Sequence, residues 1–220
     1  MHQKILKSQE KNHLIKKIAP EDTFYPPELK NHFFSKALPD LLAIGKFELL
    51  NHKKFAFFCS VRCPGHLILK AHDLLQNLKQ AGVTVIGGFH SPVERECLTI
   101  LLRGKQPVII CPARSLKGMR MKKEFKKPLE EGRMLFLSPF KESQRRNTVE
   151  TATERNRFVA ALAESVFVAN ASPNSKMEKF CYEVLKFGKP LYTFESEANK
   201  FLINIGAKPL FESNLDLLIS

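Results

Sequence analysis

The stretch from Gly87 to Glu94 contains the most chemically informative spacing in the chain. Gly87 and Gly88 leave room for a phosphate to approach the backbone. Ser91 and Glu94 lie three residues apart, with a proline at the first helical position, and this is the pattern of a capping box. The N-terminus of a helix offers unpaired N–H groups and the positive end of the helix dipole. The stretch therefore indicates an anion site that suits phosphate.

Four more segments place small, hydroxyl-bearing or cationic residues directly after an apolar run of strand length. They are Ser60-Val61-Arg62, Pro112-Ala113-Arg114, Ser138-Pro139-Phe140 and Asn170-Ala171-Ser172-Pro173-Asn174-Ser175-Lys176. Open parallel sheets bind ligands outside the carboxyl ends of their strands, near the point where the strand order reverses. We therefore expect these segments and Gly87–Ser91 to form one phosphate-binding rim. Phe89 and Phe140 are expected in the core, with base stacking as the alternative.

The charge of the chain indicates an anionic partner. Its 220 residues carry a formal net charge of +13 and give a pI near 9.6, and nucleic acid is the usual partner of such a protein. A generally basic surface without a specific partner is the alternative. Two basic stretches stand out: residues 114–127, expected to form one loop, and Arg145-Arg146 with Arg155-Asn156-Arg157. Arginines there are suited to form bidentate hydrogen bonds with phosphates.

The elements that must position these residues alternate between strand and helix. Apolar runs at 55–60, 83–86, 107–111, 134–138, 166–169 and 191–194 have the length of buried strands. Helical spacing of apolar residues lies between them, over 67–81, 92–103, 151–164, 176–187 and 199–205. This alternation predicts an α/β fold, an open, mostly parallel, doubly wound Rossmann-like sheet with helices on both faces. With 44% hydrophobic residues, the chain can bury one large core.

The beginning of the chain is expected to be less regular. Residues 1–23 are polar and basic, and they predict a mobile arm or a weak helix over residues 5–18. Pro26-Pro27 predicts an extended segment rather than a helix. Leu38–Lys46 predicts a short strand at the edge of the sheet. The expected domain is 24–220, with 24–50 as its opening segment.

The five cysteines lack the spacing of a metal site or of a disulfide framework. Cys59 and Cys63 have no second pair at zinc spacing, and the count is odd. We expect reduced cysteines that pack as small hydrophobic residues, and neither a metal nor a cofactor. No apolar run approaches membrane-spanning length, so a cytoplasmic protein without membrane contact is expected.

Several ordered motifs are similar to those of the DNA-processing protein DprA (Smf) family, a Rossmann-like branch of the SLOG superfamily. The resemblance covers residues 24–210. Its most specific piece is Arg155-Asn156-Arg157-Phe158-Val159-Ala160-Ala161-Leu162. The other pieces are Tyr25-Pro26-Pro27-Glu28-Leu29, Ala43-Ile44-Gly45-Lys46, Phe57-Phe58-Cys59-Ser60-Val61-Arg62, Ala81-Gly82-Val83-Thr84-Val85-Ile86-Gly87-Gly88, and Asn199-x-x-Leu202-Ile203-x-x-Gly206-Ala207.

The resemblance implies binding of single-stranded DNA during natural transformation, transfer of the strand to the recombinase RecA, and a homodimer. His90–Glu96 and Ser172–Glu178 depart from the family pattern, and no C-terminal winged-helix domain is expected, so the chain resembles a divergent, minimal branch. By the match to family motifs, Arg62, Gly87, Gly88, Arg155, Asn156 and Arg157 would contact phosphates. With the rim residues, the candidate DNA-binding set is Ser60, Arg62, Gly87, Gly88, His90, Ser91, Arg114, Arg155, Asn156, Arg157, Ser172, Ser175 and Lys176.

A small nucleotide is the alternative ligand. The Gly87–Glu94 stretch is loosely similar to the loop of the phosphoribohydrolase branch of the same superfamily, in which a glutamate acts on the ribose. Glu94 would take that part in hydrolysis of an N-glycosidic bond, unless it only caps its own helix. His90 has no visible carboxylate partner for general base catalysis. A binding protein is therefore expected rather than an enzyme.

Overall fold

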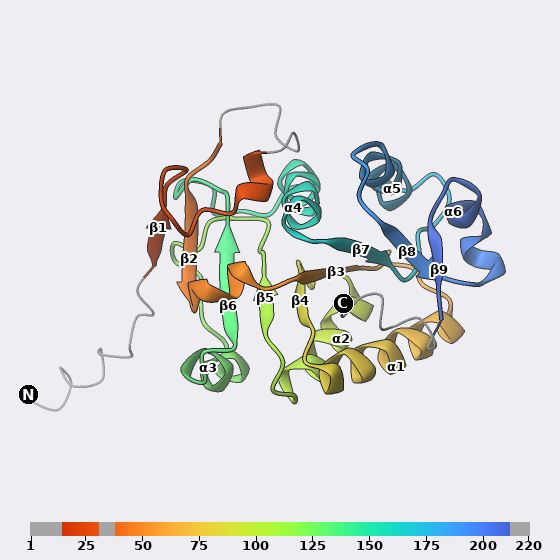
Figure 1. The fold of residues 1–220 in the computed structure, drawn as a ribbon, viewed down its shortest axis with the longest axis horizontal. Helices are drawn as coiled ribbons and strands as arrows, with labels where there is room; N and C mark the ends of the chain where they lie inside the picture. The colour runs from red at the N-terminus through yellow and green to blue at the C-terminus, as the bar shows by residue number, and fades with distance from the viewer. Residues whose placement is uncertain (1–14, 31–37, 212–220) are drawn as a thin grey trace, which may run out of the picture.

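The computed structural model describes residues 15–30 and 38–211, and in them nine strands form one sheet (Figure 1). The strand order is β1-β2-β6-β5-β4-β3-β7-β8-β9. The strands from β6 to β9 in this order are parallel, whereas β2 is antiparallel to both of its neighbours. Their bounds are β1 Lys16–Ile18, β2 Leu41–Gly45, β3 Lys54–Phe58, β4 Thr84–Gly87, β5 Val108–Ile110, β6 Met134–Ser138, β7 Ser165–Val168, β8 Leu191–Phe194 and β9 Lys208–Leu210.

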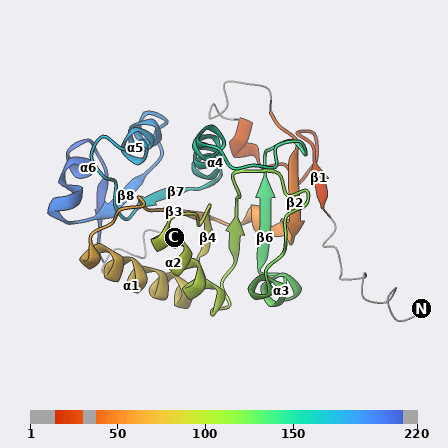
Figure 2. The same ribbon diagram turned by 180° about the vertical axis from the view of Figure 1, so that it is seen from behind.

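Helices cover both faces of the sheet, which confirms the predicted α/β architecture (Figures 1 and 2). One face packs against α1 (Gly65–Ala81), α2 (Pro92–Leu102) and α3 (Lys123–Glu130). The other packs against α4 (Val149–Leu162), α5 (Lys176–Lys186) and α6 (Lys200–Asn204). Short 3₁₀ helices span Pro27–Lys30 (η1), Phe47–Asn51 (η2) and Glu197–Asn199 (η3). No helix in the described ranges has the length and apolar character needed to cross a membrane.

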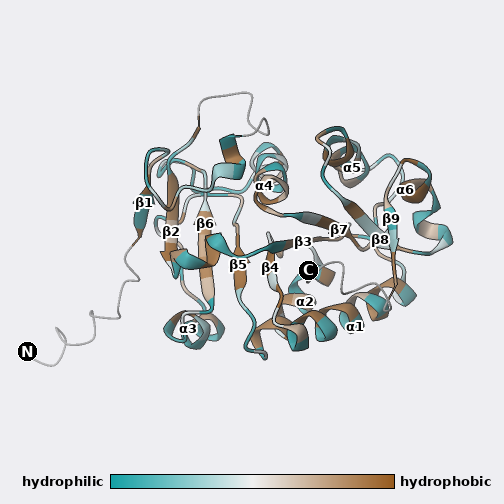
Figure 3. Ribbon diagram, in the orientation of Figure 1, coloured by the Kyte–Doolittle hydropathy of each residue, from teal (hydrophilic) through white to brown (hydrophobic). Residues whose placement is uncertain are grey.

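The period-two alternation of β3 explains why one apolar strand fills two cores. Phe55 and Phe57 face the α1–α3 side, where Phe57 stacks on Phe167 at 5.9 Å between ring centroids. Phe58 faces the opposite side and meets Phe180 of α5 edge-on at 4.9 Å. In Figure 3 the ribbon is hydrophobic in colour along β6 and β7 and mixed in colour along α1, as expected for strands covered on both faces and a helix covered on one.

The predicted helix boundaries of the first half are confirmed by their capping contacts. Helix α1 ends at Gly82, whose φ of 74° is the left-handed conformation that glycine adopts at low cost. Helix α2 begins with the predicted capping box between Ser91 and Glu94. Local sequence chemistry therefore decides where these helices start and stop.

The expectations for the opening of the chain were wrong in three respects. Lys16–Ile18 is strand β1 rather than helix or mobile arm, because it pairs with Leu41–Ala43 of β2. That pairing makes β2 an inner strand, not an edge strand. The segment after Pro26 is the 3₁₀ helix η1, since a proline at the first helical position loses no hydrogen bond. Residues 1–14 of the expected arm lie outside the described residues.

One strand and one α-helix were also not predicted. Strand β9 adds to β8 at the far edge of the sheet. Helix α3 lies inside the basic stretch that we expected to be one loop, and it buries Phe125, Pro128 and Leu129. The low apolar content of this helix and its internal proline hide the helical period in the sequence.

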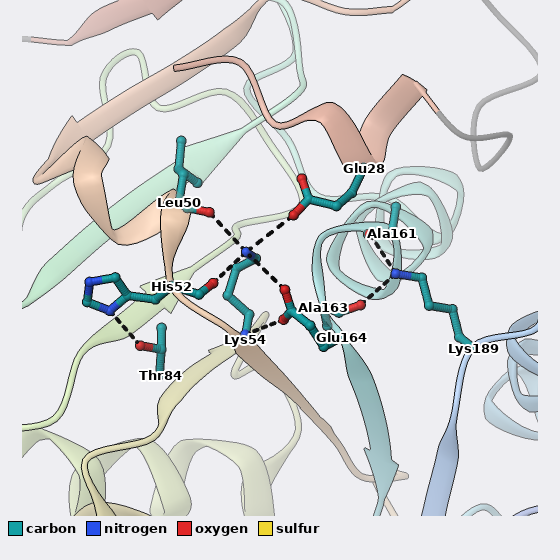
Figure 4. Close-up of polar contacts among 9 residues, drawn as sticks. All are labelled: Glu28, Leu50, His52, Lys54, Thr84, Ala161, Ala163, Glu164 and Lys189. Carbon is teal, nitrogen blue, oxygen red and sulfur yellow. Dashed lines mark hydrogen bonds and ion pairs between the residues drawn. The ribbon is translucent and has the colours of Figure 1, made fainter. Parts of the chain in front are cut away.

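A buried polar cluster ties η1 to the amino end of β3 (Figure 4). The Lys54 side chain is 1% exposed, and its Nζ donates to the carbonyls of Leu50 at 2.9 Å and His52 at 2.7 Å. Oε1 atoms of Glu28 and Glu164 each lie 3.6 Å from the same nitrogen. A charge removed from water requires such partners, so the cluster holds the opening segment against the sheet.

Candidate nucleic-acid interface

The switch point of the sheet lies at the carboxyl end of β3. From β3 the chain crosses to β4 on one side, and β7 occupies the other side. Three loops therefore meet there: residues 59–64 after β3, 88–91 after β4 and 169–175 after β7. Open sheets of this kind place their ligands in this crevice.

Hydrogen bonds join the loop after β3 to the loop after β7. The Ser60 amide donates to the Asn170 carbonyl at 2.9 Å, and the Ser172 amide donates to Ser60 Oγ at 3.2 Å. The Arg62 carbonyl accepts from Asn170 Nδ2 at 2.9 Å and from Ser172 Oγ at 3.4 Å. Among the described residues the exposed Arg62 side chain has no ion-pair partner. The backbone of Arg62 is thus fixed while its guanidinium stays available to a ligand.

The amides of His90, Ser91 and Glu94 at the start of α2 already have hydrogen-bond partners. One Glu94 oxygen accepts from the amides of His90 at 2.7 Å and Ser91 at 3.3 Å, and the other accepts from the Cys59 amide at 3.0 Å. The Glu94 side chain is buried and so joins the end of β3 to the start of α2. The expectation that these N–H groups are free for phosphate was therefore wrong, because an internal carboxylate takes that position.

Arg155 lies under the rim, and the position of its side chain requires a glycine at residue 88. Its guanidinium is buried, with Nε donating to Asn156 Oδ1 at 2.8 Å and Nη1 to the Cys111 carbonyl at 3.2 Å. A Cβ atom on Gly88 would lie 1.3 Å from Nη1, so the guanidinium can occupy this position only beside a glycine. Burial lowers the pKa of Arg155, and the negative charge of Glu94 acts against this effect.

Three adjoining hollows form a track along the rim. The central hollow, of about 480 Å³, shares His90 and Arg155 with a hollow of about 490 Å³. It shares Arg62 and Ser172 with a third hollow, of about 750 Å³. We name the second the Arg114 hollow and the third the Lys200 hollow, after one basic residue in the lining of each.

Most of the predicted site residues meet in this track. The central hollow is lined by Ser60, Arg62, His90, Ser91, Arg155, Asn156, Ser172, Ser175 and Lys176, and Gly88 and Arg114 line the Arg114 hollow. Gly87 instead ends β4 in the interior, where an added Cβ would lie 3.2 Å from the Phe57 carbonyl. Phe89 and Phe140 are buried, as expected for core residues.

Arg157 does not join the track. Its Nε and Nη2 both donate to the Glu183 carboxylate at 2.6 Å, and this pairing raises the pKa of Arg157. It lines a separate hollow of about 970 Å³ that also contains Asp40, Glu142, Glu150 and Glu154. These four carboxylates outnumber the cations of that hollow, which are Lys17, Lys141 and Arg157, whereas the lining of the central hollow includes Glu94 as its one carboxylate. We therefore place the candidate site at the smaller central hollow. Arg157, which the family motif led us to expect at the phosphates with Arg62, therefore lies outside the track.

The lysines of α3 also lie apart from the track. Figures 1 and 2 place α3 at the end of β6 opposite its arrowhead, whereas the rim lies at the carboxyl ends of the strands. Lys122 pairs with Glu124 at 3.3 Å and Lys127 with Glu131 at 3.7 Å. These exposed ion pairs indicate that part of the basic stretch is an ordinary solvated surface.

Sequence reasoning missed two rim residues. Val149 is 52% exposed at the first turn of α4 and lines the central and Arg114 hollows. Lys200 lines the Lys200 hollow, and it begins α6, a helix that the sequence did predict. A cation at the start of a predicted helix was the available signal for Lys200. No local pattern marks Val149, because its exposure depends on how α4 packs.

Replacement of Arg157 by alanine is expected to leave affinity for single-stranded DNA within about twofold of wild type, because its guanidinium is engaged with Glu183 and not with the rim. Loss of this partly exposed pair should lower the free energy of unfolding by at most about 1 kcal/mol, because solvent screens it. Oligonucleotide titration and urea unfolding measure the two effects. Glu183→Gln is the matched control for stability, and a tenfold loss of DNA affinity in Arg157→Ala would place the arginine back in the site.

The fold and the rim define a class: an open Rossmann-like α/β protein with cationic and hydroxyl-bearing side chains at its switch point. The chain belongs to the DNA recombination-mediator protein A family, whose sequence model matches residues 16–214. No curated protein sequence matches the chain.

Solved structures with the same fold include two DNA processing proteins A. The protein from Streptococcus pneumoniae is 19% identical with a TM-score of 0.74, over 96% of this chain and 75% of that one. The protein from Helicobacter pylori, described for its single-stranded DNA binding mode, is 20% identical with a TM-score of 0.74, over 94% and 95%. The molybdenum cofactor carrier protein of Chlamydomonas reinhardtii is 12% identical with a TM-score of 0.53, over 76% and 98%.

Proposed function

We propose that this protein binds single-stranded DNA along the rim track, as a cytoplasmic recombination mediator in DNA processing such as natural transformation. The observation that carries the proposal is the set of three adjoining hollows at the switch point, with Arg62 lining both the central and the Lys200 hollow and having no ion-pair partner in the described part of the chain. Family membership supports it, as does the single-stranded DNA binding described for the Helicobacter pylori protein.

The track has the chemistry of a sequence-independent strand site. Arg62, Lys176 and Arg114 supply cations for phosphates, and Ser60 and Ser175 supply hydroxyl groups beside them. The central hollow also has apolar lining from Met177 and Phe180, toward which bases can turn. Phosphate contacts without base-edge contacts imply affinity that falls steeply with salt and depends little on sequence.

We also propose a homodimer and transfer of the strand to a RecA-type recombinase, both from the family resemblance. Light scattering of the purified chain tests the first. Co-precipitation with a RecA protein in the presence and absence of oligonucleotide tests the second.

Replacement of Arg62 by alanine is expected to weaken binding of a fluorescent oligo-dT by about tenfold, because one charge-assisted phosphate contact is lost. The slope of log affinity against log salt should fall by about 0.7, the value for one phosphate of a single strand. Fluorescence anisotropy at several salt concentrations measures both. Melting temperature should not change, because the side chain is exposed.

Lys126→Ala is the matched control. It removes the same charge from an exposed residue of α3, at the other end of the sheet, and should bind like wild type. Equal losses in both variants would mean that overall charge, and not the rim, holds the DNA. Absence of binding by the wild type at low salt would exclude the proposed function.

A nucleotide hydrolase is not favoured by the geometry. Both Glu94 oxygens accept backbone N–H groups: one caps its own helix, as predicted from the sequence, and the other holds the Cys59 amide at the end of β3. We therefore propose no catalytic role for Glu94.

A further inference from the structure

The Arg114 hollow differs in charge from the other two hollows of the track. Its described lining contains Arg114 and Arg155 and no carboxylate. By contrast, Glu94 lines the central hollow and Glu197 lines the Lys200 hollow. The lining also includes Thr148, the N-cap of the 14-residue helix α4, where the positive end of the helix dipole lies. The charges around the Arg114 hollow therefore favour an anion.

Arg155 brings a buried cation to this hollow without an opposite charge to pair with. The residue is only 5% exposed, and no ion pair joins it to a carboxylate in the described part of the chain. Its Nε and Nη1 donate to Asn156 and to the Cys111 carbonyl, but the described residues give Nη2 no hydrogen-bond partner. Both oxygens of Glu94 are already engaged with backbone amides. A buried charge is costly unless an opposite charge compensates it, and an anion in the hollow would do so.

The track is not favoured to continue beyond the Arg114 hollow. Val149 is 52% exposed and lines both this hollow and the hollow of about 970 Å³ that contains Arg157. Carboxylates outnumber cations in the lining of that larger hollow. A polyanionic strand leaving the Arg114 hollow on that side would therefore meet like charge. This makes the Arg114 hollow a favourable place for the end of a strand.

We propose that the Arg114 hollow binds the terminal phosphate of a single DNA strand, an inference that rests on the proposed function. A terminal phosphate is a monoester with three free oxygens and a charge of about −1.5 to −2 near neutral pH, more than the single charge of a phosphate inside the strand. It also ends the chain, so no second sugar separates it from the lining. Arg155 supplies the buried charge-assisted donor, and Arg114 supplies a second, partly exposed one. From this end the strand runs through the central hollow, past Arg62, to the Lys200 hollow.

Competition against a fluorescent oligo-dT, followed by anisotropy, tests the preference for a phosphate end. The competitors are three forms of one oligo-dT of about 12 nucleotides, with hydroxyl groups at both ends, with a 5′-phosphate or with a 3′-phosphate. One of the two phosphorylated strands should compete about tenfold better than the hydroxyl-ended strand, the gain expected from one charge-assisted contact. The form that gains shows the direction of the strand. Equal affinity of all three forms, or an equal gain from either phosphate, would overturn the proposal and leave the proposed function standing.

Substitutions then locate the preference, which is read as a ratio of affinities within each variant. Arg155→Met and Arg114→Ala should each reduce the tenfold ratio to under about threefold, because a donor to the terminal phosphate is lost. Arg62→Ala is the matched control: it removes a charge from the central hollow, and it should weaken all three competitors alike and keep the ratio. Arg114→Ala changes a partly exposed side chain, so it decides the result if Arg155→Met does not fold. A full ratio in Arg114→Ala would overturn the placement of the phosphate.

Thermal unfolding distinguishes a strand end from a free mononucleotide, which carries the same phosphate. At equal concentration, dTMP should raise the melting temperature less than the preferred phosphorylated strand, because the strand also occupies the central hollow, and thymidine should have no effect. Stabilisation by dTMP equal to that by the strand would assign the hollow to a mononucleotide and overturn the strand-end proposal. Failure of every oligonucleotide to bind would exclude the proposed function and the strand end together.

Discussion

Replacement of Lys54 by methionine is expected to lower the free energy of unfolding by about 3 kcal/mol. The methionine matches the lysine in length but leaves the carbonyls of Leu50 and His52 without their donor. It also leaves Glu28 and Glu164 without the cation that lies 3.6 Å from each. Removing one member of a buried ionic cluster costs more than removing all of it, because the remaining charges stay unpaired.

Urea unfolding measures this effect, and Lys53→Met is the control because Lys53 is the exposed neighbour. Adding Glu28→Gln and Glu164→Gln to Lys54→Met should recover part of the loss, since the orphaned charges are then removed. A loss of under about 0.5 kcal/mol for Lys54→Met, the range of ordinary surface substitutions, would show that the cluster is not a stabilising element.

Replacement of Gly88 by alanine is expected to destabilise the fold by about 3 kcal/mol and to disrupt the rim. The new Cβ would lie 1.3 Å from Nη1 and 1.9 Å from Cζ of Arg155, so the guanidinium must leave its buried position. Arg155 then loses its hydrogen bond to the Cys111 carbonyl, and that buried carbonyl is left without this donor. Because Arg155 lines two of the hollows, affinity for single-stranded DNA should fall with stability.

Gly65→Ala is the matched control, because a Cβ there meets nothing within 4 Å and the residue begins α1. A double-mutant cycle sharpens the test. Arg155→Met should cost clearly less in the G88A background than in wild type, since the arginine has already been displaced. Additive effects, measured by urea unfolding, would contradict the steric account.

The sequence alone was sufficient where the cause is local. The apolar runs of the parallel strands, the capping box of Ser91 and Glu94, and the left-handed Gly82 each follow from neighbouring residues, and the structure confirms them. Strand β1 could not be predicted from the sequence, because its three residues become a strand only by pairing with β2. The family resemblance also came from ordered local motifs, and the match over residues 16–214 confirms it.

The arginine–asparagine–arginine motif of α4 shows what only the tertiary structure decided. Arg155 and Arg157 are two residues apart, about 200° around a helix, so they cannot face the same side. Which of them faces the rim depends on the packing of α4. In the structure Arg155 lies under the rim, and Arg157 pairs with Glu183.

The same holds for the buried charges. Lys54 looks like any strand residue in the sequence, yet its partner Glu164 lies 110 residues away. The amino-acid sequence thus determined the α/β fold and the caps at Gly82 and Ser91, because these depend on propensity, periodicity and local capping contacts. It also indicated most of the segments along the track, but Pro139 and Phe140 of the predicted rim line the separate hollow instead. The tertiary structure alone decided which cations stay free and which are neutralised, because a charge is paired by neighbours in space.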